Sequence, residues 1–258
     1  MEIIEKKRTV IVTGGASGIG RAICVKFASE DANIIIADKD ETKANCTLSE
    51  ISKLTNGEVT VFIGDLSEEK VCKELVEYSV LRFGRIDVLI NNIGIFNGMG
   101  LDATESEWIE VFKTNVLSYV WSIKYAVPFL KNSQGNIVNI SSISGVIAQP
   151  NYLVYSTTKS ALINMVKCLA LDLSKYNIRV NNICPATVWS ESNAYYINRD
   201  YGVDFEGACK HPEIGGKHPI GRIATTEEIA NATYFLASSE ASFITGVNLM
   251  VDGGYTIV

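Results

Sequence analysis

The sequence predicts a single α/β domain of the doubly wound, Rossmann-like type, in which helices flank a sheet of seven mainly parallel strands. Three observations predict this fold. Short runs rich in Val and Ile alternate with longer segments of helical periodicity, a glycine-rich turn follows the first run directly, and no Pro/Gly-rich linker divides the 258 residues. We therefore expect residues 1–258 to form one domain.

The predicted strands are seven short apolar runs. The first six lack an alternating polar face, which is expected when helices cover both sides of a parallel sheet. These runs lie at residues 9–12, 33–37, 59–63, 88–90, 136–140, 179–183 and 248–251.

The segments between the runs have helical periodicity, with long helices expected at 108–130 and 152–175. Three of the segments begin with residues typical of helix N-caps. The capping pairs are Ser67 before Glu68, Thr104 with Glu107, and Thr225 with Glu228. Segment 186–222 has no clear period, and its glycines and prolines are expected to break any regular element. We expect it to be either disordered or a lid.

Composition favours a small-molecule partner. The net charge is −6, from 23 Lys+Arg and 29 Asp+Glu, and no basic stripe is present, so neither nucleic acid nor an anionic membrane is expected to bind. Residues 1–8 alternate acids and bases, and no window has the length of a membrane-spanning helix, which predicts a cytoplasmic protein. The six cysteines are scattered and are expected to be buried free thiols, and with two histidines no metal site is expected.

A glycine-rich turn at 13–20, with the sequence Thr-Gly-Gly-Ala-Ser-Gly-Ile-Gly, follows the first predicted strand and opens a helical segment. Glycines let the backbone approach a pyrophosphate closely, and the helix N-terminus attracts its charge. A bare glycine string can also be an ordinary tight turn. The expected cofactor contacts in this turn are Gly14, Ser17, Gly18, Ile19 and Gly20.

Asp38 ends the second predicted strand, 18 residues after Gly20. A carboxylate there can accept hydrogen bonds from the 2′-hydroxyl of an adenosine ribose and would repel a 2′-phosphate, so NAD is predicted as the cofactor. Lys39 keeps NADP open as an alternative, because a base beside this pocket can accommodate phosphate.

Tyr155 and Lys159 lie four residues apart in the helical segment 152–175, on one helix face. An ammonium ~4 Å from the phenol, at an effective dielectric of ~20, contributes on the order of 4 kcal/mol, or roughly three pKa units. Tyr155 can then act as a general acid/base near neutrality, although a Tyr-x3-Lys pair alone is common on helix surfaces.

Two further polar residues accompany this pair. Ser142 follows the fifth predicted strand, at the end where ligands bind in an open parallel sheet, and can donate to a substrate oxygen. Asn115 lies within the helical segment 108–130, where an amide is a mediocre helix former. Asn115 either contacts a water molecule or the backbone, or is an ordinary helix residue without a function.

Taken together, these residues resemble the short-chain dehydrogenases/reductases over essentially the whole chain. The motifs that carry the resemblance are the glycine turn at 13–20, Asp65-Leu66, Asn91-Asn92-Ile93-Gly94, Asn115, Ser142 and Tyr155-Ser156-Thr157-Thr158-Lys159. The resemblance implies that Tyr155 is the general acid/base and that Ser142 polarises the carbonyl. It also implies that Lys159 binds the nicotinamide ribose and lowers the tyrosine pKa, and that Asn115 holds a water in a proton relay.

The resemblance extends to the cofactor contacts. It implies that Asp65 contacts the adenine, that Asn92 contacts the ribose region, and that the backbone of Val188 contacts the carboxamide. Leu66 and Gly94 belong to the same contact set. Three positions depart from the family pattern and narrow the nicotinamide pocket or alter its carboxamide contact: Ile93 replaces Ala, Ala186 replaces Gly, and Ser190 replaces Thr.

The function implied is NAD(H)-dependent interconversion of a secondary alcohol and a ketone within one dinucleotide-binding and catalytic domain. Segment 186–222 offers polar and aromatic side chains that favour a sugar, a polyol or a similar hydroxylated molecule: Trp189, Glu191, Asn193, Tyr195, Tyr196 and Asn198. The alternatives are an NADPH-dependent ketone or 3-oxoacyl reductase, a hydroxysteroid dehydrogenase, and a dinucleotide-sensing protein without turnover. The family also implies a homotetramer or homodimer that pairs through the helices at 108–130 and 152–175.

Overall fold

A seven-stranded sheet forms the centre of the molecule, and every neighbouring pair of strands is parallel. The computed structural model describes residues 7–258. The strand order is β3-β2-β1-β4-β5-β6-β9, which confirms the predicted doubly wound fold. The strands are β1 (Thr9–Thr13), β2 (Asn33–Asp38), β3 (Val59–Ile63), β4 (Val88–Asn91), β5 (Asn136–Ile140), β6 (Arg179–Pro185) and β9 (Asn248–Val251).

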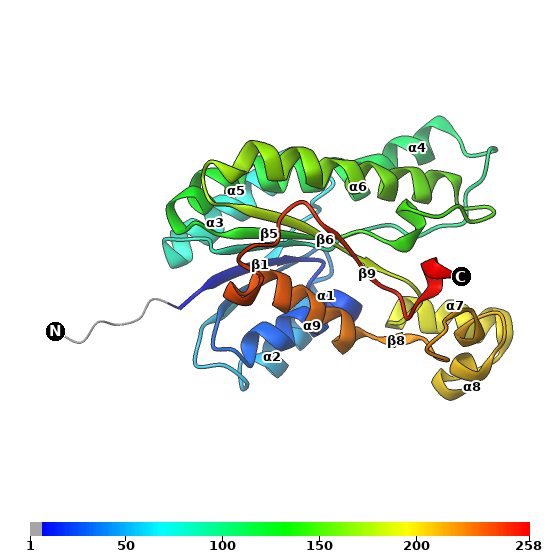
Figure 1. Cartoon of the computed structure of the whole chain (residues 1–258). Coiled ribbons are helices and arrows are strands. Elements are labelled where there is room, and N and C mark those ends of the chain that lie inside the picture. Colours follow the sequence, from blue (N-terminus) through cyan, green and yellow to red (C-terminus); the bar gives the residue numbers. More distant parts are fainter. Residues whose placement is uncertain (1–6) are drawn as a thin grey trace.

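Helices cover both faces of this sheet (Figure 1). One face carries α1 (Gly18–Ala28), α2 (Glu41–Ile51) and α9 (Thr226–Ala237), and the other carries α3 (Glu69–Phe83), α5 (Ser118–Ser133) and α6 (Leu153–Ser174). Successive side chains of β1 enter the two layers alternately: Val10 and Val12 pack with α1 and α9, and Ile11 packs with α3, α5 and α6. Because both faces of the strand are buried, its sequence has no polar alternation.

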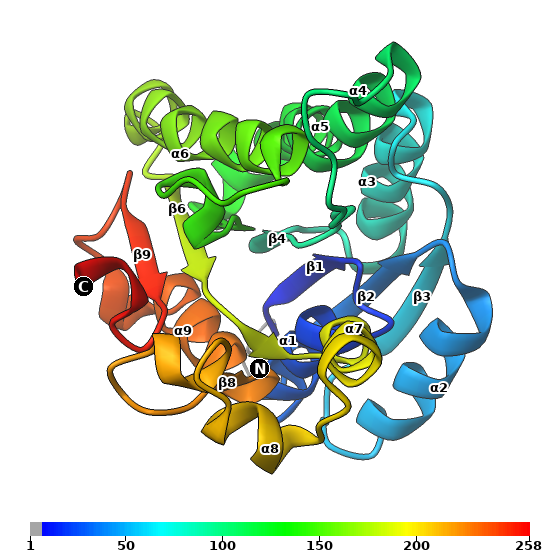
Figure 2. The ribbon, with the colours of Figure 1, turned by 90° about the vertical axis from the view of Figure 1, so that its right-hand side faces the viewer.

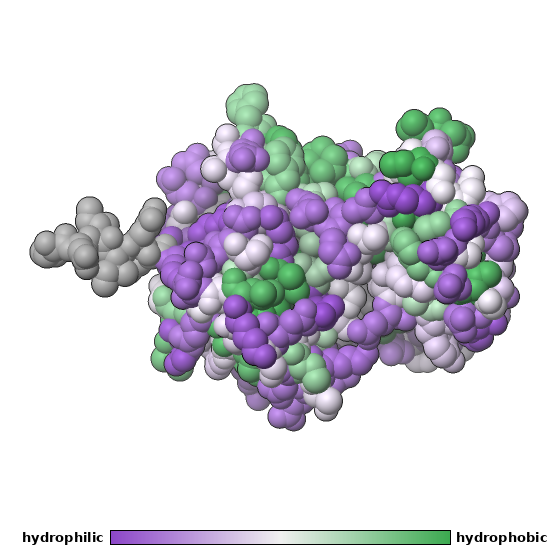
Figure 3. All heavy atoms as spheres, turned by 90° about the horizontal axis from the view of Figure 1, so that it is seen from below, coloured by the Kyte–Doolittle hydropathy of each residue, from purple (hydrophilic) through white to green (hydrophobic). Residues whose placement is uncertain are grey.

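The outer surface of the α1, α2 and α9 layer is mainly polar, with apolar side chains in small groups (Figure 3). An exposed ion pair between Arg21 and Glu50 links α1 to α2 across this surface. These helices are therefore amphipathic and bury only their inner stripe. Within residues 7–258, no helix has both the length and the apolar character needed to span a membrane.

Two of the three predicted helix caps are confirmed. Thr104 caps α4 (Glu105–Phe112) and Thr225 caps α9, each in a reciprocal pair with the glutamate three residues on. The third was wrong, because α3 begins after Glu68 and has no side-chain cap. Ser67 lies in a turn instead, where its backbone N–H donates to Asp65 Oδ1 (3.0 Å).

The predicted helix at 108–130 is not one regular helix. It consists of α4, a π-helical turn at Lys113–Leu117 and α5. Asn115 lies inside the π-helical turn and is fully buried. π-Helical turns are rare in proteins, and those that occur are often found at functional sites.

Segment 186–222 is folded, so the expectation that its glycines and prolines break any regular element was wrong. It contains α7 (Glu191–Tyr201), α8 (Phe205–Lys210) and β7 (Val188–Trp189), which pairs with β8 (Ala224–Thr225). Gly202 does not prevent a helix but ends α7, in the left-handed conformation (φ 67°). A small apolar cluster of Ile197, Ala208, Ile214 and Ile223 holds the segment together. Figure 2 shows α7 in front of the carboxyl ends of the central strands.

All six cysteines are free thiols. Cys24, Cys72 and Cys184 are buried as expected and Cys209 is partly buried, but Cys46 and Cys168 are exposed. The expectation fails at these two positions because they lie on the outward faces of α2 and α6. Among residues 7–258, no group of three or more His, Cys, Asp or Glu side chains is placed to hold a metal ion.

Candidate active site

Two clefts of about 500 Å³ and 490 Å³ lie at the carboxyl edge of the sheet. The first lies over the glycine turn and the ends of β2 and β3, and the second lies between β5, α6 and α7. Five residues line both clefts: Ile19, Asn92, Gly94, Ser190 and Ser192. Because the clefts share these residues, a molecule in the first can reach a molecule in the second. Ligands of doubly wound folds bind at this edge.

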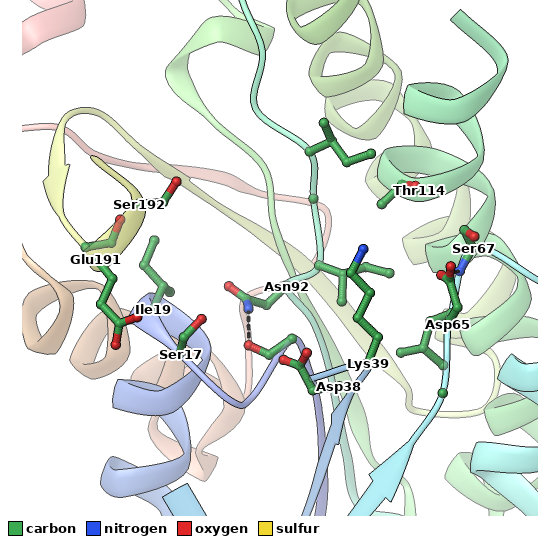
Figure 4. Close-up of a pocket in the computed structure, with 18 of the residues that line it drawn as sticks. Ser17, Ile19, Asp38, Lys39, Asp65, Ser67, Asn92, Thr114, Glu191 and Ser192 are labelled. Carbon is green, nitrogen blue, oxygen red and sulfur yellow. Dashed lines mark hydrogen bonds between the residues drawn. The ribbon is translucent and has the colours of Figure 1, made fainter. Parts of the chain in front are cut away.

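The glycine turn needs its glycines for two different physical reasons. Gly14 and Gly18 have positive φ values of 63° and 52°, which other residues rarely adopt. Gly20 is required by packing, since a Cβ there would lie 1.9 Å from the carbonyl oxygen of Gly14. Asn92 Nδ2 donates to the carbonyl oxygens of Thr13 and Gly14 (3.1 Å each) and so binds the turn to the end of β4 (Figure 4).

The start of α1 opens into the first cleft. Its N-cap, Ser17, has an extended backbone and makes no side-chain capping hydrogen bond. The first-turn N–H groups of α1 are therefore not satisfied by a side-chain cap, and together with the helix dipole they suit an anion such as a pyrophosphate.

Carboxylates lie on two sides of the first cleft. Asp38, at the end of β2, accepts hydrogen bonds from the backbone N–H groups of Ala16 and Asp40 (3.1 Å each), which fix its orientation. Asp65 follows β3, and the N–H of Ser67 holds the pKa of its carboxyl below the usual value. Lys39 lies between the two carboxylates (Figure 4).

The first residues of α7 form the opposite wall of this cleft, across from Asp65 (Figure 4). Glu191 Oε2 pairs with Lys43 Nζ of α2 at 3.0 Å, and this contact raises the pKa of Lys43. The ion pair connects segment 186–222 to the helix that follows Asp38. It therefore bridges one end of the first cleft.

Helix α6 turns Tyr155 and Lys159 toward the second cleft. Lys159 is 4% exposed, and its Nζ donates to the carbonyl oxygen of Ile140 (2.9 Å). Burial lowers the pKa of Lys159 to about 8 and raises the pKa of Tyr155 to about 12. The group that opposes the rise at Tyr155 is the Ser142 hydroxyl.

The expected net lowering of the Tyr155 pKa is not found, because burial of the phenol outweighs the effect of Lys159. Lys159 Nζ lies 5.7 Å from the centroid of the Tyr155 ring and donates to the Ile140 carbonyl.

Ser142 is the serine that faces the phenol. Its neighbour Ser141 donates to the backbone carbonyl of Lys159 (3.2 Å) and is committed to holding α6. Ser142 Oγ accepts a hydrogen bond from the N–H of Ser144 (3.1 Å), which fixes its position at the start of a short 3₁₀ turn.

Asn115 connects two elements behind the second cleft. Its Oδ1 accepts from the N–H of Ile95 (2.7 Å), and its Nδ2 donates to the Ile95 carbonyl (3.0 Å) and to Thr158 Oγ1 (3.1 Å). Both amide hydrogens are thus used by the protein, so the structure gives Asn115 a positioning contact. Its role toward a water stays a prediction.

Two aromatic residues that were not predicted as part of the site lie beside Tyr155, one in contact with its ring and the other behind the first. Phe96 stacks on Tyr152 (5.1 Å, 18°) and meets Tyr155 edge to face (5.0 Å, 88°). Tyr152 lies three residues before Tyr155, a spacing that could have indicated a shared helix face. Nothing in the sequence indicates Phe96, which arrives from the loop after β4.

The structure brings together most of the predicted site residues. The first cleft is lined by Gly14, Ser17, Gly18, Ile19, Asp38, Asp65, Leu66, Asn92 and Gly94. The second is lined by Ile19, Asn92, Gly94, Ser142, Tyr155, Lys159 and Val188. Gly20 and Asn115 line neither cleft, because Gly20 packs under the turn and Asn115 lies behind Gly94. Of the three departures from the family pattern, Ile93 lines the first cleft, Ala186 the second and Ser190 both.

The chain is similar to known proteins over nearly its whole length. Residues 14–256 match a family model described as "Enoyl-(Acyl carrier protein) reductase". The mouse (Mus musculus) L-fucose dehydrogenase is 37% identical over 96% of this chain and 88% of its own length. A 3-oxoacyl-(acyl-carrier-protein) reductase of Chlamydia muridarum is 35% identical over 96% of each chain. The solved structure of Thermoplasma acidophilum aldohexose dehydrogenase matches with a TM-score of 0.86 at 32% identity, over 98% of this chain and 95% of that one.

These relatives are dehydrogenases and reductases, and dehydrogenases of this kind use nicotinamide cofactors. The matches extend over nearly the whole chain, from the glycine turn to the last strand. The chain therefore belongs to the short-chain dehydrogenases/reductases and is an oxidoreductase that acts on CH–OH groups.

Proposed function

We propose that this protein is an NAD(H)-dependent oxidoreductase that interconverts a secondary alcohol and a ketone, with Tyr155 as the general acid/base. The main support for the proposal is that the two clefts meet and share lining residues. There Tyr155, Ser142 and Lys159 line a cleft that opens beside the glycine turn and the cleft of Asp38.

The first cleft fits a dinucleotide. Gly14 and Gly18 keep the backbone free of side chains where a pyrophosphate would approach, and the N–H groups at the start of α1 would bind its charge. The Asp38 carboxylate would accept hydrogen bonds from a ribose 2′-hydroxyl and would repel a 2′-phosphate, which favours NAD. When bound, the nicotinamide supplies hydride transfer to or from the substrate carbon.

Three side chains of the second cleft would carry out the proton chemistry. The Tyr155 phenolate takes the proton of the substrate hydroxyl, and Ser142 donates a hydrogen bond to the same oxygen as it becomes a carbonyl. The Lys159 ammonium stabilises the phenolate electrostatically. Burial raises the pKa of Tyr155 to about 12, so the positive charge of an oxidised nicotinamide, when bound, would act together with Lys159 to favour the phenolate.

The second cleft favours an uncharged, hydroxylated substrate such as a sugar or a polyol. Its charged side chains other than Lys159 are paired: Lys217 with Glu213 (3.0 Å) and Asp200 with Arg199 (2.6 Å). The remaining polar lining consists of hydroxyls and amides.

The alternative is an NADPH-dependent ketone or 3-oxoacyl reductase, which the position of Lys39 between Asp38 and Asp65 favours.

Removing the charge of Asp38 should weaken the discrimination between the two cofactors. In Asp38→Asn the side chain keeps an acceptor for the Ala16 N–H but no longer repels a phosphate, so affinity for NADP+ should rise about tenfold. Binding isotherms for NAD+ and NADP+ measure this. Asp40→Asn is the control, because Asp40 caps α2 and does not line the cleft. A wild-type preference for NADP+ would contradict the assignment of NAD.

Breaking the ion pair between Glu191 and Lys43 should speed release of NADH. Glu191→Gln removes an exposed contact between α7 and α2, so the dissociation rate should rise by up to about fivefold. Stopped-flow fluorescence measures the rate. The matched control is Glu206→Gln on α8, which breaks an exposed pair with Lys210 away from both clefts. Equal acceleration in both variants would show that the bridge over the first cleft has no specific effect.

We further propose that the chain forms a homodimer or homotetramer through the helices at 108–130 and 152–175. Apolar side chains on or next to these segments are exposed, namely Ile109, Phe112, Val120, Leu153 and Leu171. A monomer mass in solution would contradict this proposal.

A further inference from the structure

A chain of hydrogen bonds that the proposed mechanism does not use runs from Ser142 along the wall of the second cleft. Ser142 Oγ and Ser144 Oγ lie 3.2 Å apart, and Ser144 Oγ donates to Gln149 Oε1 at 2.7 Å. Ser144 is 4% exposed, and all three residues line the cleft. The Gln149 side chain is therefore held in place at a fixed separation from the serine that faces the phenol.

The free end of the Gln149 amide is the unused part of this chain. Its carbonyl oxygen is bound to Ser144, and within residues 7–258 its Nε2 makes no hydrogen bond. The two ends of an amide can exchange places, and the free end would then be an acceptor. A hydroxyl group is both a donor and an acceptor, so it matches the amide in either orientation.

The spacing between Ser142 and Gln149 indicates where a substrate hydroxyl would bind. The hydroxyl of Ser144 lies between the two side chains. The two oxygens of a vicinal diol are about as far apart as two hydrogen-bonded oxygens, ~2.8 Å. With one diol oxygen bound to Ser142, the other would lie about one hydrogen-bond length further on, and the Gln149 amide is the next polar group along this wall of the cleft after Ser144.

The charged side chains of the second cleft favour a substrate whose second polar group is uncharged. The carboxylates of Glu213 and Asp200 are paired with Lys217 and Arg199, and so offer no free partner to a charged substituent. The Gln149 amide is neutral, so it can bind an uncharged substrate oxygen without leaving an unpaired charge in the cleft.

We propose that Gln149 is a specificity-determining residue that binds a second hydroxyl, on the carbon next to the reacting one. The substrate class is then a vicinal diol in the oxidising direction and an α-hydroxy ketone in the reducing direction. This inference rests on the proposed function, since it assumes that Ser142 binds the reacting oxygen.

The test compares kcat/KM for the cis and trans isomers of cyclohexane-1,2-diol with kcat/KM for cyclohexanol, using NAD+. The wild-type protein should prefer one diol isomer to cyclohexanol by about tenfold, the value of one neutral hydrogen bond. In Gln149→Met, which keeps the length of the side chain but not its polar atoms, the ratio of diol to cyclohexanol should fall to about one. Gln149→Glu retains an acceptor and should retain much of the preference.

The outcomes separate the inference from the proposed function. An equal loss on diol and cyclohexanol in Gln149→Met would mean that Gln149 acts only through Ser144 on Ser142, and would overturn the inference. An unchanged ratio would also overturn it. If no secondary alcohol is oxidised with either cofactor, the proposed function fails, and the inference fails with it.

Discussion

Replacing Tyr155 with Phe should lower kcat for alcohol oxidation by about 10²- to 10⁴-fold, because the variant has no group to take the hydroxyl proton. The ring contact with Phe96 and the position of Lys159 should persist, since neither requires the phenol oxygen. NADH binding should therefore change little. Steady-state rates and a fluorescence titration with NADH measure the two quantities separately.

The control for this experiment is Tyr152→Phe. Tyr152 lines the same cleft and stacks on the same Phe96 ring, but no catalytic group contacts its hydroxyl. Its loss should lower kcat far less than the loss of the Tyr155 hydroxyl. In the wild-type protein the rate of oxidation should rise with pH, because the base form of Tyr155 is required and burial raises its pKa. Substantial residual turnover in Tyr155→Phe would contradict the assignment of the acid/base.

Replacing Gly20 with Ala should damage both stability and cofactor binding. The new Cβ would lie 1.9 Å from the carbonyl oxygen of Gly14, so either the turn or the start of α1 must move. Overpacking of this kind costs about 1–3 kcal/mol in the free energy of unfolding. Displacement of the turn should also weaken NADH binding by at least about tenfold, since the N–H groups at the start of α1 lose their alignment.

Gly98→Ala is the matched control for Gly20→Ala. A Cβ at Gly98 would meet its nearest neighbour, the carbonyl oxygen of Asn151, at an ordinary 3.7 Å, and its φ is not positive. Urea denaturation and NADH titration should leave this control close to wild type. If the two variants behave alike, close packing at Gly20 does not determine the shape of the turn.

The strands were predictable from sequence because both of their faces are buried. Ile34, Ile35 and Ile36 of β2 are all fully buried, and a continuous run of this kind has few alternatives to a central parallel strand. The glycine turn was predictable because its glycines are required by backbone angle and close packing. Predicted residues of both clefts meet because the carboxyl ends of parallel strands share one edge.

The features that could not be predicted depend on tertiary contacts. The π-helical turn around Asn115 is accompanied by hydrogen bonds to Ile95 and Thr158, which are distant in sequence. Helix α7 was missed because it packs on Trp189 and Phe205 and not on the central core, so its pattern of apolar residues is short. The positions of Phe96 and Gln149 follow from loops, whose paths local sequence does not determine.

The electrostatics of Tyr155 show the same limit. Sequence spacing placed Lys159 on the correct helix face, but it did not reveal that the Ile140 carbonyl binds the ammonium 5.7 Å from the ring centroid. Burial then dominates the pKa of the phenol.

The most direct test of the proposed function is reduction of NAD+ in the presence of neutral secondary alcohols, sugars and polyols first, with NADP+ in parallel. The account predicts NADH formation that is faster than NADPH formation and is lost in Tyr155→Phe. Absence of NADH formation with every alcohol, together with oxidation of NADPH by a 3-oxoacyl thioester, would contradict it.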